Sequence, residues 1–111
     1  MNWRRSVQVL GVLAARAGGA PFDEVMRDRV LEPLGMRDTG FYAADPARLA
    51  TAYENRDGQL AVTDPPDGAW SWPPGFPDGA GGLVSTAADL LTFGRMLLRG
   101  GGSVLDRKSV V

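Results

Sequence analysis

The chain has 111 residues, of which 44% are hydrophobic and 23% are charged, so we expect one folded domain or part of one. Its formal net charge of −1 disfavours nucleic acid and acidic membranes as partners. Cysteine and histidine are both absent, which excludes disulfides, metal sites built on those residues, and any Ser-His-Asp or Cys-His catalytic site within this chain.

The N-terminal segment has a weak signal-peptide pattern. Two arginines at 4–5 precede an apolar stretch over 7–15, and the triplet 15–17 resembles a small-residue cleavage site. We disfavour a signal peptide, because Gln8 interrupts the apolar stretch and Arg16 lies inside the triplet. No apolar stretch is long enough to span a membrane. The localisation stays unknown, with cytoplasmic as the expectation for the sequence as given.

Two helices are predicted in the first third of the chain, over residues 6–17 and 21–31. Apolar residues recur at a spacing of four in the first, and a glycine pair follows it as a stop signal. The second has its acidic residues early and its arginines late, as the helix dipole prefers. Pro33 is expected to end this helix by moving Glu32 away from helical backbone angles.

A small hairpin is predicted over residues 51–63, because an Asp-Gly pair at 57–58 lies between two strand-like runs. Residues 64–82 are predicted to form a long loop rich in proline and glycine. This loop also holds three aromatic residues, Trp70, Trp72 and Phe76. Two interpretations of them stay open, as anchors that fix the loop or as contacts for a ligand.

A third helix is predicted over residues 86–99, directly after a glycine-rich turn at 79–82. Ser85 and Thr86 are both placed to cap this helix, and Asp89 follows Thr86 by three residues, as in a capping box. A glycine triplet ends the helix. The elements together predict a mainly helical α+β chain.

The residues alone show no self-sufficient catalytic machinery. No serine begins a Ser-x-x-Lys, and there is no Gly-x-Ser-x-Gly elbow, dinucleotide-binding fingerprint or phosphate-binding loop. We therefore expect no cofactor, no metal and no catalytic residue in this chain. Residues 105–111 are expected to start another element.

Two blocks of the sequence resemble the serine β-lactamase-like hydrolases, which comprise class C β-lactamases, D-Ala-D-Ala carboxypeptidases and related esterases. The first runs from Pro21 to Phe41 and contains Glu-Pro-Leu-Gly-Met-x-Asp-Thr-x-Phe. The second is Gly-x-Gly-Gly-Leu-Val-Ser-Thr-Ala-Ala-Asp at 79–89. The likeness covers nearly the whole chain but only the middle of the family, so residues 1–111 are expected to form part of a β-lactamase-like domain.

The resemblance implies that the intact parent transfers an acyl group to a serine and hydrolyses an amide, β-lactam or ester. The family's Ser-x-x-Lys and its Lys-Thr-Gly or His-x-Gly strand are both missing here, so no catalytic residue is carried over. Ser85 matches a family position that caps a helix. The turn of Ala80, Gly81 and Gly82 matches one border of the family's substrate cleft, and we expect these three residues to bind substrate.

Our leading interpretation is a fragment of such a hydrolase that is inactive alone, arising from a truncated gene, a mis-called start or a split chain. Its parent would act on a small-molecule or peptidoglycan-like substrate, with a complementing chain if the parent is split. The family is often exported, although this sequence has no convincing export signal. The alternative is a non-catalytic helical binding module derived from this fold, with the three loop aromatics as its exposed patch.

Overall fold

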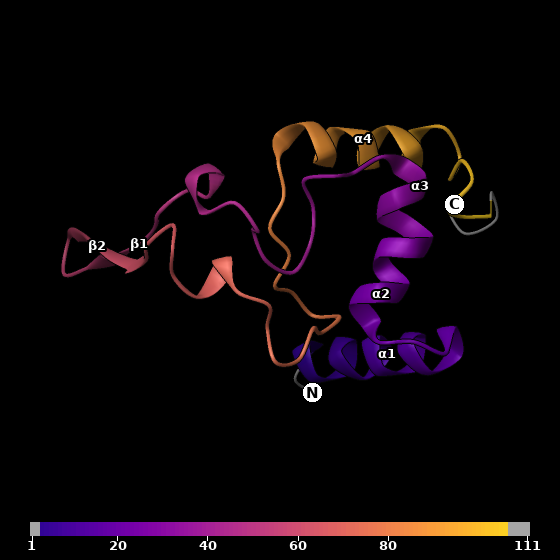
Figure 1. Ribbon diagram of the computed structural model, residues 1–111, viewed down its shortest axis with the longest axis horizontal. Helices are drawn as coiled ribbons and strands as arrows, with labels where there is room; N and C mark the ends of the chain where they lie inside the picture. Colours follow the sequence, from indigo (N-terminus) through magenta and orange to yellow (C-terminus); the bar gives the residue numbers. More distant parts are fainter. Residues whose placement is uncertain (1–2, 107–111) are drawn as a thin grey trace.

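The structure, a computed structural model, describes residues 3–106 and is elongated, with extents of 46 × 31 × 26 Å. Two helices, α1 (Trp3–Gly18) and α4 (Ala87–Leu98), lie at opposite ends of a helical column that contains α2 and α3 (Figure 1). The hairpin projects away from all of these helices (Figure 1). None of the helices in the described residues is both long enough and apolar enough to cross a membrane.

α1 is the predicted first helix, and it begins at Trp3, earlier than the predicted range 6–17. Its stop signal is confirmed, because Gly19 follows it with a φ of 69°, the left-handed conformation that commonly ends a helix. Its apolar stripe is largely uncovered in the described part of the chain, where Val9 and Leu13 are both exposed.

The predicted second helix is a continuous column of three parts: α2 (Phe22–Met26), a π-helical turn η1 (Arg27–Leu31) and α3 (Glu32–Leu34). The prediction that Pro33 moves Glu32 out of helical angles is wrong, since Glu32 has φ −65° and ψ −47°.

The π-helical turn explains how the column continues past Pro33. The N–H of Glu32 donates to the carbonyl of Arg27, five residues back, so the backbone is wider just before the proline. A wider turn leaves room for the proline ring, which in a regular α-helix clashes with the carbonyl four residues earlier. The column ends at Gly35, whose φ of 69° is left-handed.

The predicted hairpin is confirmed as β1 (Ala52–Arg56) paired antiparallel with β2 (Gln59–Asp64). The Asp-Gly pair forms its two-residue turn, and both residues have positive φ, 52° at Asp57 and 82° at Gly58. This is the turn geometry that matches the twist of two antiparallel strands.

The predicted loop at 64–82 contains one short 3₁₀ helix, η3 (Ala69–Ser71). Asp64 holds this turn, because its carboxylate accepts hydrogen bonds from the backbone N–H groups of Ala69 at 2.9 Å and Trp70 at 3.3 Å. A second 3₁₀ helix, η2 (Pro46–Arg48), precedes the hairpin and is capped by the side chain of Asp45.

α4 is the predicted third helix, and Thr86 is its N-cap. The Thr86 hydroxyl oxygen accepts a hydrogen bond from the N–H of Asp89 at 3.2 Å, which is half of the predicted capping box. The other half does not form, because the Asp89 carboxylate binds elsewhere. Ser85 as a cap is also wrong, since its hydroxyl hydrogen-bonds to Thr39.

The core of the described chain is small and is divided between the two ends of the helical column. At the start of α2, Phe22 and Phe41 pack edge to face at a centroid distance of 5.9 Å. The buried hydrophobic residues are Leu31, Met36, Phe41 and Met96. The element predicted at 105–111 falls largely outside the described residues.

Candidate functional site

A groove of about 580 Å³ lies between the glycine-rich turn and the proline-rich loop. The structure brings together here the three residues predicted to bind substrate, because Ala80, Gly81 and Gly82 all line the groove. Its apolar walls come from the core and the loop, and we call it the aromatic groove after them: Phe41, Trp70, Trp72, Pro73, Pro74 and Phe76. Substrate binding by the three turn residues stays a prediction.

The glycine-rich turn is fastened to α1 by a close backbone contact. A Cβ atom added at Gly79 would lie 2.8 Å from the carbonyl oxygen of Val7 and 3.1 Å from the Cα of Gly11. Gly11 is in turn buried. Because Gly11 and Gly79 both lack a side chain, the backbone of the turn can lie this close to the backbone of α1. The contact fixes the position of the turn on α1.

A carboxylate also holds the turn at this side of the groove. One Asp78 oxygen accepts the backbone N–H of Ala80 at 2.6 Å, and the other accepts the side-chain amide of Gln8 at 3.2 Å. Because Gln8 belongs to α1, this pair of bonds joins the helix to the turn. Asp78 therefore shapes the groove wall, with both of its oxygens already occupied.

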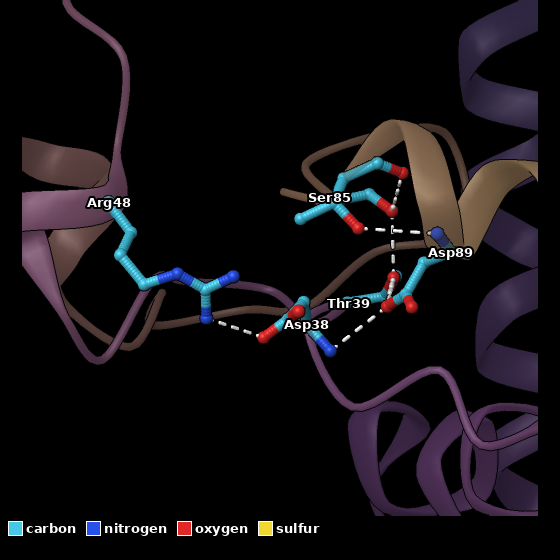
Figure 2. A network of polar contacts seen from close by, with 6 residues as sticks. Asp38, Thr39, Arg48, Ser85 and Asp89 are labelled. Carbon is cyan, nitrogen blue, oxygen red and sulfur yellow. Dashed lines mark hydrogen bonds and ion pairs between the residues drawn. The ribbon is translucent and has the colours of Figure 1, made fainter.

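A second polar cluster joins the two sequence blocks (Figure 2). One oxygen of Asp89 accepts the backbone N–H of Asp38 at 2.9 Å and the hydroxyl of Thr39 at 2.7 Å. The Thr39 and Ser85 hydroxyl oxygens are 2.7 Å apart. Asp89 lies in the first turn of α4 and is only 8% exposed, and the helix dipole favours a negative charge at that end.

The proton positions in this cluster follow from simple counting. Thr39 has one hydroxyl proton and donates it to Asp89, so a hydrogen bond between Thr39 and Ser85 uses the Ser85 proton. The carbonyl of Thr86 is the other acceptor near the Ser85 hydroxyl, and it lies farther away, at 3.4 Å against 2.7 Å for Thr39. A nucleophilic serine needs a base that takes its proton, most often a histidine or a lysine. The chain has no histidine, and its one lysine, Lys108, lies outside the described residues. Among residues 3–106 the Ser85 hydroxyl thus has a structural contact with Thr39, and neither a histidine nor a lysine lies beside it, because that part of the chain contains neither residue type.

An ion pair continues the cluster on the solvent side (Figure 2). The Arg48 guanidinium lies 2.6 Å from the carboxylate of Asp38. Its hydrogen bond lowers the pKa of the Asp38 carboxyl group below the usual value. Both side chains are substantially exposed, so the pair contributes little to stability.

Backbone pairing completes the connection between the blocks. The N–H of Gly40 donates to the carbonyl of Val84 at 3.1 Å, and the N–H of Val84 donates to the carbonyl of Gly40 at 2.8 Å. The Asp-Thr of the first block and the Ser-Thr-Ala-Ala-Asp of the second therefore form one structural unit. Sequence reasoning missed this unit, because nothing local in either block shows that they are neighbours.

Among residues 3–106, no three or more histidine, cysteine, aspartate or glutamate side chains lie together in a way that could hold a metal ion. The acidic residues at the two candidate regions, Asp38, Asp78 and Asp89, each already accept hydrogen bonds or an ion pair.

The family model described as Beta-lactamase matches residues 6–110. Among curated proteins, Protein Rv1367c of Mycobacterium tuberculosis is 41% identical over 106 residues, which are 94% of this chain and 26% of that protein. Esterase EstB of Burkholderia gladioli is 33% identical over 109 residues, which are 81% of this chain and 28% of that protein.

The solved structures show the same likeness. EstCE1, described as a hydrolase with promiscuous acyltransferase activity, matches with a TM-score of 0.77 and 28% identity. The match covers 94% of this chain and 32% of EstCE1. The chain thus spans 26% and 28% of the two curated relatives and 32% of the solved structure.

Proposed function

The chain belongs to the beta-lactamase family, and from this premise we propose that residues 1–111 form the middle part of the domain of an acyl-serine hydrolase. In the complete domain, a serine oxygen attacks the carbonyl carbon of an ester, amide or β-lactam, the C–O or C–N bond breaks, and the serine's proton goes to the alcohol or amine. The alcohol or amine leaves an ester or amide, whereas in a β-lactam it stays attached through the opened ring. Water then cleaves the acyl-serine ester and restores the serine. The serine would come from a Ser-x-x-Lys that this sequence does not contain.

The observation that carries this proposal is the aromatic groove. Its volume of about 580 Å³ lies within the range of roughly 300–1,000 Å³ that is typical of small-molecule sites. We propose that Ala80, Gly81 and Gly82 form one wall of the substrate cleft and contact a small-molecule or peptidoglycan-like substrate there.

The surface of the chain supports a larger domain around it. The accessible surface is 8261 Å², whereas a compact monomer of 11.8 kDa is expected to expose about 5,900 Å². Much of the excess is apolar, since α1 and α4 both expose large hydrophobic side chains. We propose that the remaining part of a β-lactamase-like domain covers these faces, either in the same polypeptide or as a complementing chain.

The proposal is tested by acyl labelling and by the coding DNA. We expect the purified chain neither to cleave nitrocefin or p-nitrophenyl butyrate nor to take up a fluorescent penicillin. We expect the DNA on both sides, or a neighbouring gene, to encode a Ser-x-x-Lys and a Lys-Thr-Gly or His-x-Gly. Joined to those segments, the chain should become labelled at the new serine.

Two results would contradict this function. One is hydrolysis by the chain alone that disappears in Ser85→Ala, because the nucleophile would then lie inside this sequence. The other is the absence of any Ser-x-x-Lys from the flanking DNA and from every protein that binds the chain.

A binding module without catalysis is the second candidate, and one observation favours it. Trp72 and Phe76 are 69% and 64% exposed, as contact residues of a binding surface would be. A self-standing module also needs its own core, and the four buried hydrophobic side chains of the described part make a small one. Cooperative unfolding of a monomer would favour the module over the partial hydrolase.

A further inference from the structure

We propose that the free edge of β2 pairs with the same edge of a second copy of this chain, so that the two hairpins form one four-stranded antiparallel sheet. The two-fold axis that relates the copies passes beside Ala61. This inference does not rest on the proposed function, because no residue of either strand lines the aromatic groove.

The hairpin leaves both of its outer edges unpaired within the described residues. Its sheet has only the strands β1 and β2, and it projects away from the helices (Figure 1). Among residues 3–106, no other segment forms a backbone hydrogen bond with residues 59–63. A two-stranded hairpin is marginally stable in water, whereas three or more strands with an apolar face are stable. Further strands would therefore stabilise this hairpin.

The backbone of β2 offers hydrogen-bonding groups to a further strand. The pair that closes a two-residue turn is hydrogen-bonded, and along antiparallel strands this kind of pair alternates with one that is not. Counting from the turn at 57–58, Leu60 and Val62 belong to pairs that are not hydrogen-bonded, so their N–H and C=O groups point away from β1. The irregularity of the strand pairing lies beyond Val62. The regular part of β2 thus presents two donors and two acceptors.

The side chains of β2 fit a symmetric pairing centred on Ala61. In that register Leu60 of each copy lies opposite Val62 of the other, and the two residues exchange backbone hydrogen bonds, four in all. Their side chains share one face of the strand and are 78% and 53% exposed, so they form apolar cross-strand pairs. Ala61 faces its own copy at the axis, where a small side chain causes no crowding. No charged residue occurs over 59–63.

The charges of the hairpin disfavour the same pairing at the edge of β1. The register that forms four hydrogen bonds there is centred on Glu54, because Glu54 is the residue of β1 opposite Ala61. It places the Glu54 carboxylates of the two copies directly opposite each other, and like charges in that position are destabilising. Charged side chains on an edge strand are a common protection against pairing. The β2 edge is therefore the one that pairs, and the assembly stops at two copies.

The experiment traps the pair with a disulfide, to which the chain is suited because it contains no cysteine. Ala61→Cys places two thiols opposite each other, at a Cα separation of about 4.5 Å that allows a disulfide. Thr63→Cys is the matched control, since Thr63 lies on the same strand and is more exposed than Ala61. The register offsets the two copies of residue 63 by four residues, roughly 14 Å. Both chains carry Leu90→Ser and Leu98→Ser, which remove exposed leucines of α4 that would cause other association.

At a chain concentration of about 0.1 mM, we expect Ala61→Cys to cross-link about tenfold faster than Thr63→Cys. Pairing holds the thiols of the first chain at an effective concentration in the millimolar range, whereas those of the second meet by random collision. In concentrated urea the two chains should cross-link at equal rates, because the hairpin is then unfolded.

Hydrogen exchange of the cysteine-free chain with the two serine substitutions is an independent measurement. The outward amides of β2, at Leu60 and Val62, should exchange more slowly as the chain concentration rises. The outward amides of β1, at Tyr53 and Asn55, should keep their rates, because that edge stays free. This comparison decides the result if a cysteine variant does not fold.

Two results overturn the inference. One is equal cross-linking of the two cysteine chains without urea, which would mean that contact between copies is random. The other is an exchange rate at Leu60 and Val62 that does not depend on concentration, as expected where the edge pairs with a different protein or with none. Neither result bears on the acylation of a serine, which the labelling experiment tests separately.

Discussion

Asp89 joins the start of α4 to the Asp38–Thr39 turn, whereas a capping-box residue contacts only the start of its own helix. Its backbone N–H donates to the hydroxyl oxygen of Thr86, the N-cap of α4, while its carboxylate accepts hydrogen bonds from the Asp38–Thr39 turn. A buried charge is tolerated only when it is well hydrogen-bonded, and here two donors meet one oxygen in the first turn of a helix. The residue thus stabilises both the start of α4 and the turn beside it.

Replacing Asp89 by alanine should destabilise the chain. The N–H of Asp38 and the hydroxyl of Thr39 would lose their acceptor, which costs about 1–3 kcal/mol for groups that stay buried. Urea unfolding of Asp89→Ala measures this free energy. Asp67→Ala is the matched control, since Asp67 is exposed, and it should unfold like the original chain. Equal midpoints for the two variants would contradict the role given to Asp89.

The Asp38–Arg48 ion pair predicts a small pH dependence of stability. Arg48 lowers the pKa of the folded Asp38, so the pair stabilises the folded state above the unfolded pKa. This stability is lost as the pH falls through the folded pKa, because the protonated carboxyl no longer attracts the arginine. Melting temperatures between about pH 2 and 6, around the normal aspartate value, should fall less steeply in Arg48→Ala. Identical slopes, or a steeper slope in the variant, would show that the pair does not form.

At the level of elements, two local rules had different outcomes. The Asp-Gly turn folded as the sequence predicts, since hairpin geometry depends on the two turn residues themselves. The rule that Pro33 ends a helix did not hold, because the π-helical turn before it removes the clash on which the rule depends.

The contact between α1 and the glycine-rich turn predicts a strong effect at Gly79. A Cβ in Gly79→Ala would be 2.8 Å from a backbone carbonyl oxygen of α1, and backbone cannot move aside as a flexible side chain can. We expect a loss of about 1–3 kcal/mol in stability, as for other overpacked sites. Hydrogen exchange of the α1 amides should speed up as the turn separates from the helix.

Gly75→Ala is the control for this contact, because an added Cβ at Gly75 meets no atom within 4 Å. Its α1 amides should exchange at the original rate. A Gly79→Ala chain as stable as Gly75→Ala would mean that the turn does not rest on α1.

At the level of the whole molecule, the arrangement is more open than its length requires. The radius of gyration is 15.8 Å, whereas a compact chain of this length is expected at about 13 Å. The two helices at the ends of the column carry exposed apolar side chains, of which Leu98 is 90% exposed. Such a shape fits a segment that packs into a larger domain. The comparisons agree with this, because the chain spans 26% of Protein Rv1367c and 32% of EstCE1.

We therefore expect the isolated chain to self-associate. Light scattering after size-exclusion chromatography should give a mass above 11.8 kDa, and a dye such as ANS should bind to the exposed apolar faces. Replacing Leu90 and Leu98 of α4 by serine should reduce both signals, because both side chains are exposed and outside the core. A monomer that binds no dye and unfolds cooperatively would favour the binding module.

The sequence by itself determined the features that depend on neighbouring residues: the hairpin turn at 57–58, the Thr86 cap and the stop after α1. It also determined the family, through two blocks of characteristic residues. Only the tertiary structure decided that these blocks meet. Asp38 and Asp89 are 51 positions apart, and Gln8 and Asp78 are 70 apart, so no local rule relates them. The aromatic groove depends on the same long-range contacts, because Gln8 of α1, the proline-rich loop and the glycine-rich turn all line it. Folding alone brings these segments together, since burial and hydrogen bonding act between residues that are near in space and not only in sequence.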